Sequence, residues 1–197
     1  MGHRLEAAAS GRSSCRGCGS KLPKGELRFG ECVDNPFGDG EATYWFHPWC
    51  AALMRPEPLL QLEAEVVALT EGAAMLQTAQ EGIEYRRLPR LMRVESAPSG
   101  RARCRSCREL IEKGALRFSL AMFEDGRMNP IGFIHVSCAA AYFDTISLLP
   151  RLQRLQPDLD ADTLKACRAQ LDAASDARGP GPAKVLDASS EEERKKA

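Results

Sequence analysis

Apolar residues recur at helical spacing in the second quarter of the chain. Residues 57–80 are rich in Leu, Ala, Glu and Gln, and their apolar positions repeat every three or four residues, which predicts helix. These positions are Leu59, Leu62, Val66 and Leu69. Pro56 and Pro58 suit a first helical turn, while Gly72 and Gly82 argue against one uninterrupted helix.

The pattern is less uniform beyond this stretch. Residues 85–94 fit either a short helix or a strand, and Pro89 favours a break. A further helix is expected after Cys138, and it should stop near Pro150. Its apolar positions are Tyr142, Phe143, Ile146 and Leu149.

The last part of the chain divides into a helix and a tail. A helix fits residues 162–174, with Asp160 or Asp162 as its N-cap. Leu164, Cys167 and Leu171 would share one face of this helix. From residue 176 onward Gly, Pro, Ser and charged residues dominate, and we expect disorder there.

Two stretches of the chain match at an offset of 89 residues. Residues 10–30 read SGRSSCRGCGSKLPKGELRFG, and residues 99–119 read SGRARCRSCRELIEKGALRFS, with identity at 11 of these 21 positions. The offset then falls to 88, which aligns His47 with His135 and Cys50 with Cys138. The chain therefore contains an internal repeat.

Each copy of the repeat carries a Cys-x2-Cys pair followed by His-x2-Cys. A CxxC turn offers two thiolates from one tight turn, and residues three apart share a helix face, so the four side chains can surround a tetrahedral zinc ion. The predicted ligands are Cys15, Cys18, His47 and Cys50 in the first copy, and Cys104, Cys107, His135 and Cys138 in the second. Cys3His sites without an open position are structural, so both zinc ions should stabilise the fold.

The remaining cysteines and the remaining histidine lie outside this scheme. Cys32 has no cysteine partner at the repeat-equivalent position, which is Ala121, and Cys167 lies on the apolar face of a predicted helix, so we expect both to be buried core residues. His3 should be disordered or lie on the surface.

Composition and charge restrict the function. The formal net charge is zero, which argues against nucleic-acid binding through overall charge. The N-terminus has no apolar signal segment and no apolar run is long enough to span a membrane, so we expect an intracellular protein without membrane association. No P-loop or Gly-rich nucleotide motif is present, and we expect no enzyme activity.

The predicted fold is a pair of small α+β zinc-binding modules, joined and followed by α-helices and ending in a disordered tail. The expected divisions are a flexible N-terminus at 1–9, a first zinc finger at 10–56, a helical linker at 57–98, a second finger at 99–145, C-terminal helices at 146–175 and a tail at 176–197.

The repeat resembles the poly(ADP-ribose) polymerase-type zinc finger. The resemblance lies in Ser-Gly-Arg before the CxxC, Lys-Gly-x-Leu-Arg after it, an Asp-Gly loop and the final His-x2-Cys, and it covers residues 10–54 and 99–143. In the first module Trp45 and Phe46 precede the histidine as in the family, whereas the second has Phe133 and Ile134. Fingers of this family recognise DNA strand breaks by structure, with little preference for base sequence.

The resemblance also implies DNA contacts. Arginines before the CxxC would contact backbone phosphate, and the Leu-Arg arginines would lie at the DNA surface, because guanidinium groups suit phosphate. Residues beside the Asp-Gly loop would stack on the base pair exposed at a break. The DNA-binding residues expected on this basis are Arg12, Arg28, Phe37, Arg101, Arg117, Phe123, Arg127 and Met128.

The two modules should differ in DNA binding. The first loop has Glu41 where the family often has lysine, and Gly38 and Ala42 stand at its stacking positions. The second loop keeps an aromatic residue, a cation and an apolar tip, so we expect the second module to be the stronger DNA contact. The favoured function is recognition of DNA ends, nicks or gaps by a DNA-associated protein of the nucleoid or nucleus. The alternative is a zinc-stabilised adaptor that binds protein partners through its helices.

Overall fold

The chain folds into two similar units, each built on a three-stranded antiparallel sheet. The computed structural model describes residues 2–35 and 38–176. The first sheet has the order β1 (Arg4–Ala7), β2 (Leu27–Asp34) and β3 (Glu41–Phe46). The second has the order β4 (Leu91–Ser96), β5 (Leu116–Glu124) and β6 (Arg127–His135). The repeat seen in the sequence is therefore a repeat of structure, and the predicted pair of small α+β modules is confirmed.

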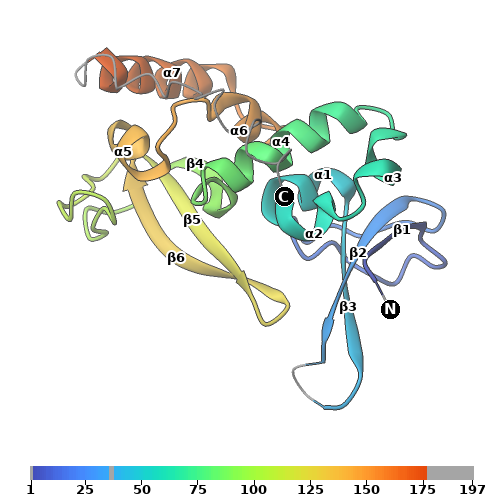
Figure 1. The fold of residues 1–197 in the computed structure, drawn as a ribbon. Helices are drawn as coiled ribbons and strands as arrows, with labels where there is room; N and C mark the ends of the chain where they lie inside the picture. The colour runs from blue at the N-terminus through green and yellow to red at the C-terminus, as the bar shows by residue number, and fades with distance from the viewer. Residues whose placement is uncertain (1, 36–37, 177–197) are drawn as a thin grey trace, which may run out of the picture.

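Helices follow each sheet. The first sheet leads into α1 (Pro48–Met54), α2 (Pro56–Leu60), α3 (Glu63–Val67) and α4 (Gly72–Glu84). A 3-10 turn, η2 (Val136–Cys138), then α5 (Ala139–Phe143), α6 (Leu149–Leu155) and α7 (Ala161–Asp176) follow the second. Figure 1 shows the helices gathered on one side of the molecule, with the hairpins β2–β3 and β5–β6 projecting from them in a common direction.

Two hydrophobic cores hold these elements. Phe29 and Phe46 of the first sheet pack with Leu59, Val66 and Ala79 of the helices that follow, and all five are fully buried. Residues 57–80 are helical as predicted, but they complete the first module instead of forming a separate linker. The physical reason is that their apolar face covers the sheet, which is too small to bury its own side chains.

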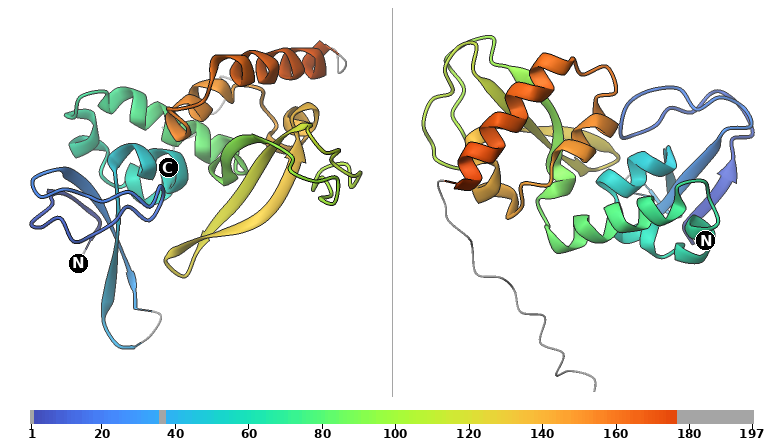
Figure 2. Two further views of the ribbon diagram at one scale, coloured as in Figure 1. Left: turned by 180° about the vertical axis from the view of Figure 1, so that it is seen from behind. Right: turned by 90° about the horizontal axis from the view of Figure 1, so that it is seen from above.

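The second core shows the same arrangement. Leu91 and Val94 of β4 pack with Phe118 of β5 and with Cys167 and Leu171 of α7. Figure 2 shows α6 and α7 over the second sheet and α1–α4 beside the first. The segment whose pattern fitted either helix or strand thus contains a 3-10 turn, η1 (Leu88–Arg90), followed directly by the strand β4.

The structure differs from the sequence expectations at two further places. Residues 4–7 form a strand paired with β2 and are not a flexible N-terminus. Pro150 lies in the first turn of α6 and does not end a helix. The preceding helix α5 ends at Phe143, and its C-cap residue Asp144 has a φ of +61°. Asp160 caps α7 as expected, since its Oδ1 accepts a hydrogen bond from Thr163 N at 2.8 Å. The tail expected to be disordered, apart from residue 176, lies outside the described residues.

The two modules contact each other through α6 as well as through their sheets. The buried side chain of Arg151 donates to the carbonyl oxygen of Leu53 at the end of α1. Arg154 stacks over Trp49, 3.7 Å from the ring centroid, and pairs with Glu71 at 2.5 Å. Within the described residues, no helix combines the length and the apolar character needed to cross a membrane.

Candidate zinc centres and nucleic-acid interface

Each module brings its four predicted zinc ligands together. In both sets the ligand atoms lie within 4.8 Å of one another. Cys18 Sγ lies 3.4 Å from His47 Nδ1, and Cys50 Sγ lies 3.8 Å from the same nitrogen. The second module repeats both distances. Tetrahedral zinc with Zn–S near ~2.3 Å and Zn–N near ~2.0 Å places its ligands about 3.5–3.8 Å apart, so the geometry fits zinc, and the cofactor prediction of two zinc ions is confirmed.

Secondary structure places these ligands from three directions. The CxxC turn supplies two thiols, the histidine comes directly after β3 in the first module and ends β6 in the second, and the next helical turn supplies the final cysteine. His47 N donates to Cys15 Sγ at 3.4 Å, and His135 N donates to Cys104 Sγ at the same distance. The ligands therefore join the turn, the sheet and the helix of each module at one point.

The outer nitrogen of each histidine has its own partner. His47 Nε2 lies 3.5 Å from Glu26 Oε1, and His135 Nε2 lies 3.2 Å from the carbonyl oxygen of Leu110. An Nε2–H that donates to these oxygens leaves Nδ1 free to bind metal and fixes the orientation of the ring.

The crowding of thiols changes their acidity in opposite directions. Hydrogen bonding from Cys50 and from backbone N–H groups lowers the pKa of Cys15, and the same proximity, together with burial, raises the pKa of Cys50. In the second module burial and the neighbouring Cys104 raise the pKa of Cys138 to about 12. A cluster that disfavours several thiolates at once needs a cation, and Zn²⁺ supplies the compensating charge.

The two zinc turns differ at one backbone position. Gly19 ends the first turn with a φ of +79°, and Arg108 stands at the repeat-equivalent position with a φ of +71°. Both residues close the same hydrogen bond, from their own N–H to the carbonyl of the first cysteine, at 2.8 and 2.9 Å. The turn requires a left-handed residue, which only glycine adopts without strain, so the second turn carries strain that the first avoids.

Of the two extra cysteines, one is in the core as expected and one is not. Cys167 is fully buried, and burial raises its pKa to about 11. Cys32 is only half-buried on β2, where its N–H donates to His3 Nδ1 at 3.1 Å. His3 also contacts Phe29, with ring centroids 6.1 Å apart, so it is tied to the first sheet rather than free at the surface.

The Leu-Arg arginines, expected at the DNA surface, are instead internal. Arg28 is only 8 % exposed; its Nη2 lies 2.6 Å from Glu6 Oε1, and its guanidinium stacks 3.5 Å from the Trp45 ring centroid. Arg117, 5 % exposed, makes the same pair of contacts with Glu95 and Phe133, at 2.6 and 3.5 Å. These arginines join the first strand of each sheet to the last and offer little surface to phosphate.

Sequence reasoning missed the partners of these arginines, although a signal was present. Glu6 and Glu95 are 89 residues apart, the same offset as the repeat, and so are Arg4 and Arg93 and also Ala8 and Ala97. The repeat therefore begins at β1 and β4, upstream of residues 10 and 99. Hydrogen bonding from Arg28, together with the positive charge of its guanidinium, lowers the pKa of Glu6.

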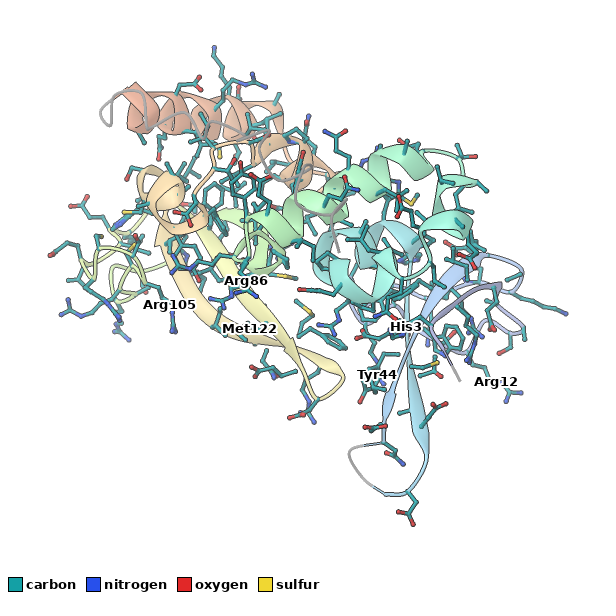
Figure 3. The ribbon with its side chains drawn as sticks, viewed as in Figure 1. His3, Arg12, Tyr44, Arg86, Arg105 and Met122 are labelled. Carbon is teal, nitrogen blue, oxygen red and sulfur yellow. The ribbon has the colours of Figure 1, made fainter. Side chains whose placement is uncertain are left out.

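Phe123, expected to stack on a broken DNA end, packs against the first module. Its ring lies 5.3 Å from that of Phe46 and 5.6 Å from that of Tyr44, in edge-to-face contacts. The Arg55 guanidinium covers it at 4.9 Å. Figure 3 shows Tyr44 on the side of the first hairpin that faces the second, which carries Met122. The stacking residue of the second loop is thus used between modules.

The other expected DNA residues divide by position. Arg12, Arg101 and Arg127 are exposed, and Figure 3 shows Arg12 projecting into solvent from the first module. Met128 is half-buried and lines a groove between the modules together with Arg12 and Arg127. Phe37 lies outside the described residues.

The sequence is similar to known proteins that contain zinc fingers. Residues 6–79 match the family described as the poly(ADP-ribose) polymerase and DNA-ligase zinc-finger region. A poly [ADP-ribose] polymerase of Sarcophaga peregrina is 27 % identical over 191 residues, covering 83 % of this chain, and poly [ADP-ribose] polymerase 1 of Gallus gallus is 30 % identical over 167 residues, covering 75 %. The matched region spans 19 % and 16 % of those relatives. The family match runs into α4, in agreement with a first module that includes its helices.

Metal content tests both centres. We expect two zinc ions per chain, and Cys107→Ala should lose one of them and unfold the second module, because a three-ligand site loses much of the ~10 kcal/mol or more that zinc binding contributes. Elemental analysis and amide hydrogen exchange measure the two effects. Cys32→Ser is the control and should keep both ions. A wild-type chain with one zinc ion would contradict the assignment.

The substitution Arg117→Ala should destabilise the second module. Removing the guanidinium leaves Glu95 without its partner and uncovers Phe133, which should lower the free energy of unfolding by about 2 kcal/mol. Urea unfolding measures this change. Arg101→Ala, at an exposed position of the same module, should stay within about 0.5 kcal/mol of wild type. Equal effects of the two substitutions would show that the internal contacts of Arg117 contribute little.

Substitutions at the left-handed position of the two CxxC turns should change the stability of the two modules in opposite directions. Arg108→Gly should raise the stability of the second module by up to ~1 kcal/mol by removing the left-handed strain, whereas Gly19→Ala should lower that of the first by a similar amount. Thermal unfolding of the zinc-loaded variants measures both. A destabilised Arg108→Gly protein would mean that the Arg108 side chain contributes more than its backbone costs.

Proposed function

Because this chain belongs to the poly(ADP-ribose) polymerase-type zinc finger family, we propose that it binds DNA in a zinc-dependent manner and prefers ends or strand breaks to intact duplex. The chain covers less than a fifth of the length of the relatives compared, so this proposal concerns the zinc-finger region alone. Its action here is binding without catalysis.

The observation that carries the proposal is the set of exposed arginines on the zinc turns. Each turn is held rigid by its metal ligands and displays arginines before and between its cysteines. The arginines available to phosphate are Arg12 and Arg16 in the first module and Arg101 and Arg103 in the second, whereas the guanidinium of Arg105 donates to the carbonyl oxygen of Ile131. Since the whole chain has no net charge, such local gathering is what phosphate binding requires.

Contacts of this kind position a protein on DNA without reading its sequence. Phosphate oxygens are the same at every base pair, so guanidinium contacts discriminate shape and not base identity. The family resemblance implies the same mode, in which a break is recognised by structure. The two hairpins project in a common direction (Figure 1), which supports one DNA ligand held by both modules.

The adaptor function remains the rival. Single exposed apolar residues are common on any protein surface, and the large ones exposed among the described residues are Leu27, Val67, Ile83, Leu110 and Ile146. Exposed apolar side chains of this kind do not by themselves favour a protein partner over DNA.

A mobility-shift assay separates the two functions. The probes are nicked, blunt-ended linear and covalently closed circular DNA of one sequence, at low ionic strength. We expect the nicked and linear forms to bind several-fold more tightly than the closed form, with affinity falling as salt rises because counterions are released. Chelation of zinc should abolish binding, and added zinc should restore it. Absence of salt-dependent binding to any probe would leave the adaptor as the better function.

A further inference from the structure

The hairpin tip of the second module is fitted to the first module. Beyond the packing of Phe123, Gly126 at the tip sits against the Tyr44 ring so closely that a Cβ added there would lie 2.5 Å from Tyr44 Cε1. Gly126 also has a φ of +76°, a conformation that favours glycine. The positive φ suits the two-residue hairpin turn of Asp125 and Gly126, and the missing side chain of Gly126 lets the Tyr44 ring approach the tip.

The contact creates a groove between the modules. The groove, of about 530 Å³, lies beside β3, where Arg16 N donates to the carbonyl oxygen of Trp45 at 2.8 Å. Arg12 and Arg16 line it from the first zinc turn, and Arg127 and Met128 line it from the second hairpin. No acidic residue is among the described residues that line it, although the chain as a whole has as many acidic as basic residues.

We propose that this groove, called here the junction groove, binds one stretch of DNA sugar-phosphate backbone and that both modules must hold it together. The inference rests on the proposed function and names the surface that performs it. Three arginines with hydroxyl groups beside them suit successive phosphates, and Met128 supplies an apolar contact. Phe123 is a positioning residue: it holds the two walls of the groove at a fixed distance and does not touch the DNA.

The repeat-equivalent residues make different contacts in the second module. The residues equivalent to Arg16 and Tyr44 are Arg105 and Gly132. Arg16 lies over the Tyr44 ring at 5.6 Å, whereas Arg105 lies against Gly132 and donates to the carbonyl of Ile131 at 2.5 Å. The second module therefore lacks the aromatic ring on which a hairpin tip could pack. The arginine of its CxxC turn is hydrogen-bonded to its own sheet.

Matched substitutions in the two repeats test the groove. Arg16→Ala and Arg127→Ala should each weaken binding to nicked DNA about five- to tenfold and reduce the salt slope by about one unit. Arg105→Ala, the repeat counterpart of Arg16, should change affinity by less than about twofold. Equal losses for Arg16→Ala and Arg105→Ala would overturn the groove while leaving DNA binding intact. Failure of the wild-type protein to bind would instead overturn the proposed function itself.

Substitutions at the contact test the role of Phe123. Phe123→Ala and Gly126→Val should separate the modules, weaken binding at least as much as Arg127→Ala and reduce the salt slope, with two zinc ions retained as proof of folding. Phe123→Leu keeps an apolar side chain and should retain most of the affinity. If Phe123→Ala and Phe123→Leu both abolish the preference for nicked DNA without changing the salt slope, Phe123 stacks on DNA bases, and the positioning role is wrong.

Discussion

Four ligands that must meet at one point determine the shape of each module. The two thiols of the CxxC turn, the histidine at the end of a strand and the cysteine of the next helical turn come from segments about 30 residues apart. Their thiols oppose one another's ionisation until a cation joins them. Once zinc binds, the turn, the sheet and the helix can no longer move independently, and a hairpin projects from this fixed base as a rigid arm. The position of each hairpin tip therefore depends on a metal centre at its other end.

Residues that are identical between the repeats stabilise the sheet of each module from which the hairpin projects. Arg28 and Arg117 match between the modules because each joins the first and last strands of a sheet through a carboxylate and an aromatic ring. A resemblance to DNA-binding fingers suggests surface contacts for such arginines, but identity alone does not separate a ligand contact from an internal one. Burial does separate them, and it places these two inside.

Much of the architecture could be predicted because zinc coordination requires Cys and His residues at a recognisable spacing. The repeat offset of 89 residues and the Cys and His positions were sufficient for both metal centres, and helical periodicity was sufficient for residues 57–80. The sheets extended further than expected because strand pairing is non-local: β1 and β4 are short, and only their partners reveal them. Pro150 was ambiguous for a local reason, since proline both ends helices and suits their first turn. The contact between modules left no periodic signal, because it joins one aromatic residue to a distant sheet.

The residues that differ between the repeats determine how the two modules pack against each other. Phe123 has no aromatic counterpart in the first hairpin, where Asp34 and Asn35 occupy the matching positions, and Tyr44 has none in the second, where Gly132 stands. The tip of one module can therefore dock on the other in one direction only. A head-to-tail contact that both modules could make would continue from chain to chain and form open assemblies. Here each module carries only one half of the contact, and the two halves meet within one chain. Two similar fingers thereby form a single asymmetric body, in which the shared positions maintain the fold and the unshared ones set the geometry between the two arms.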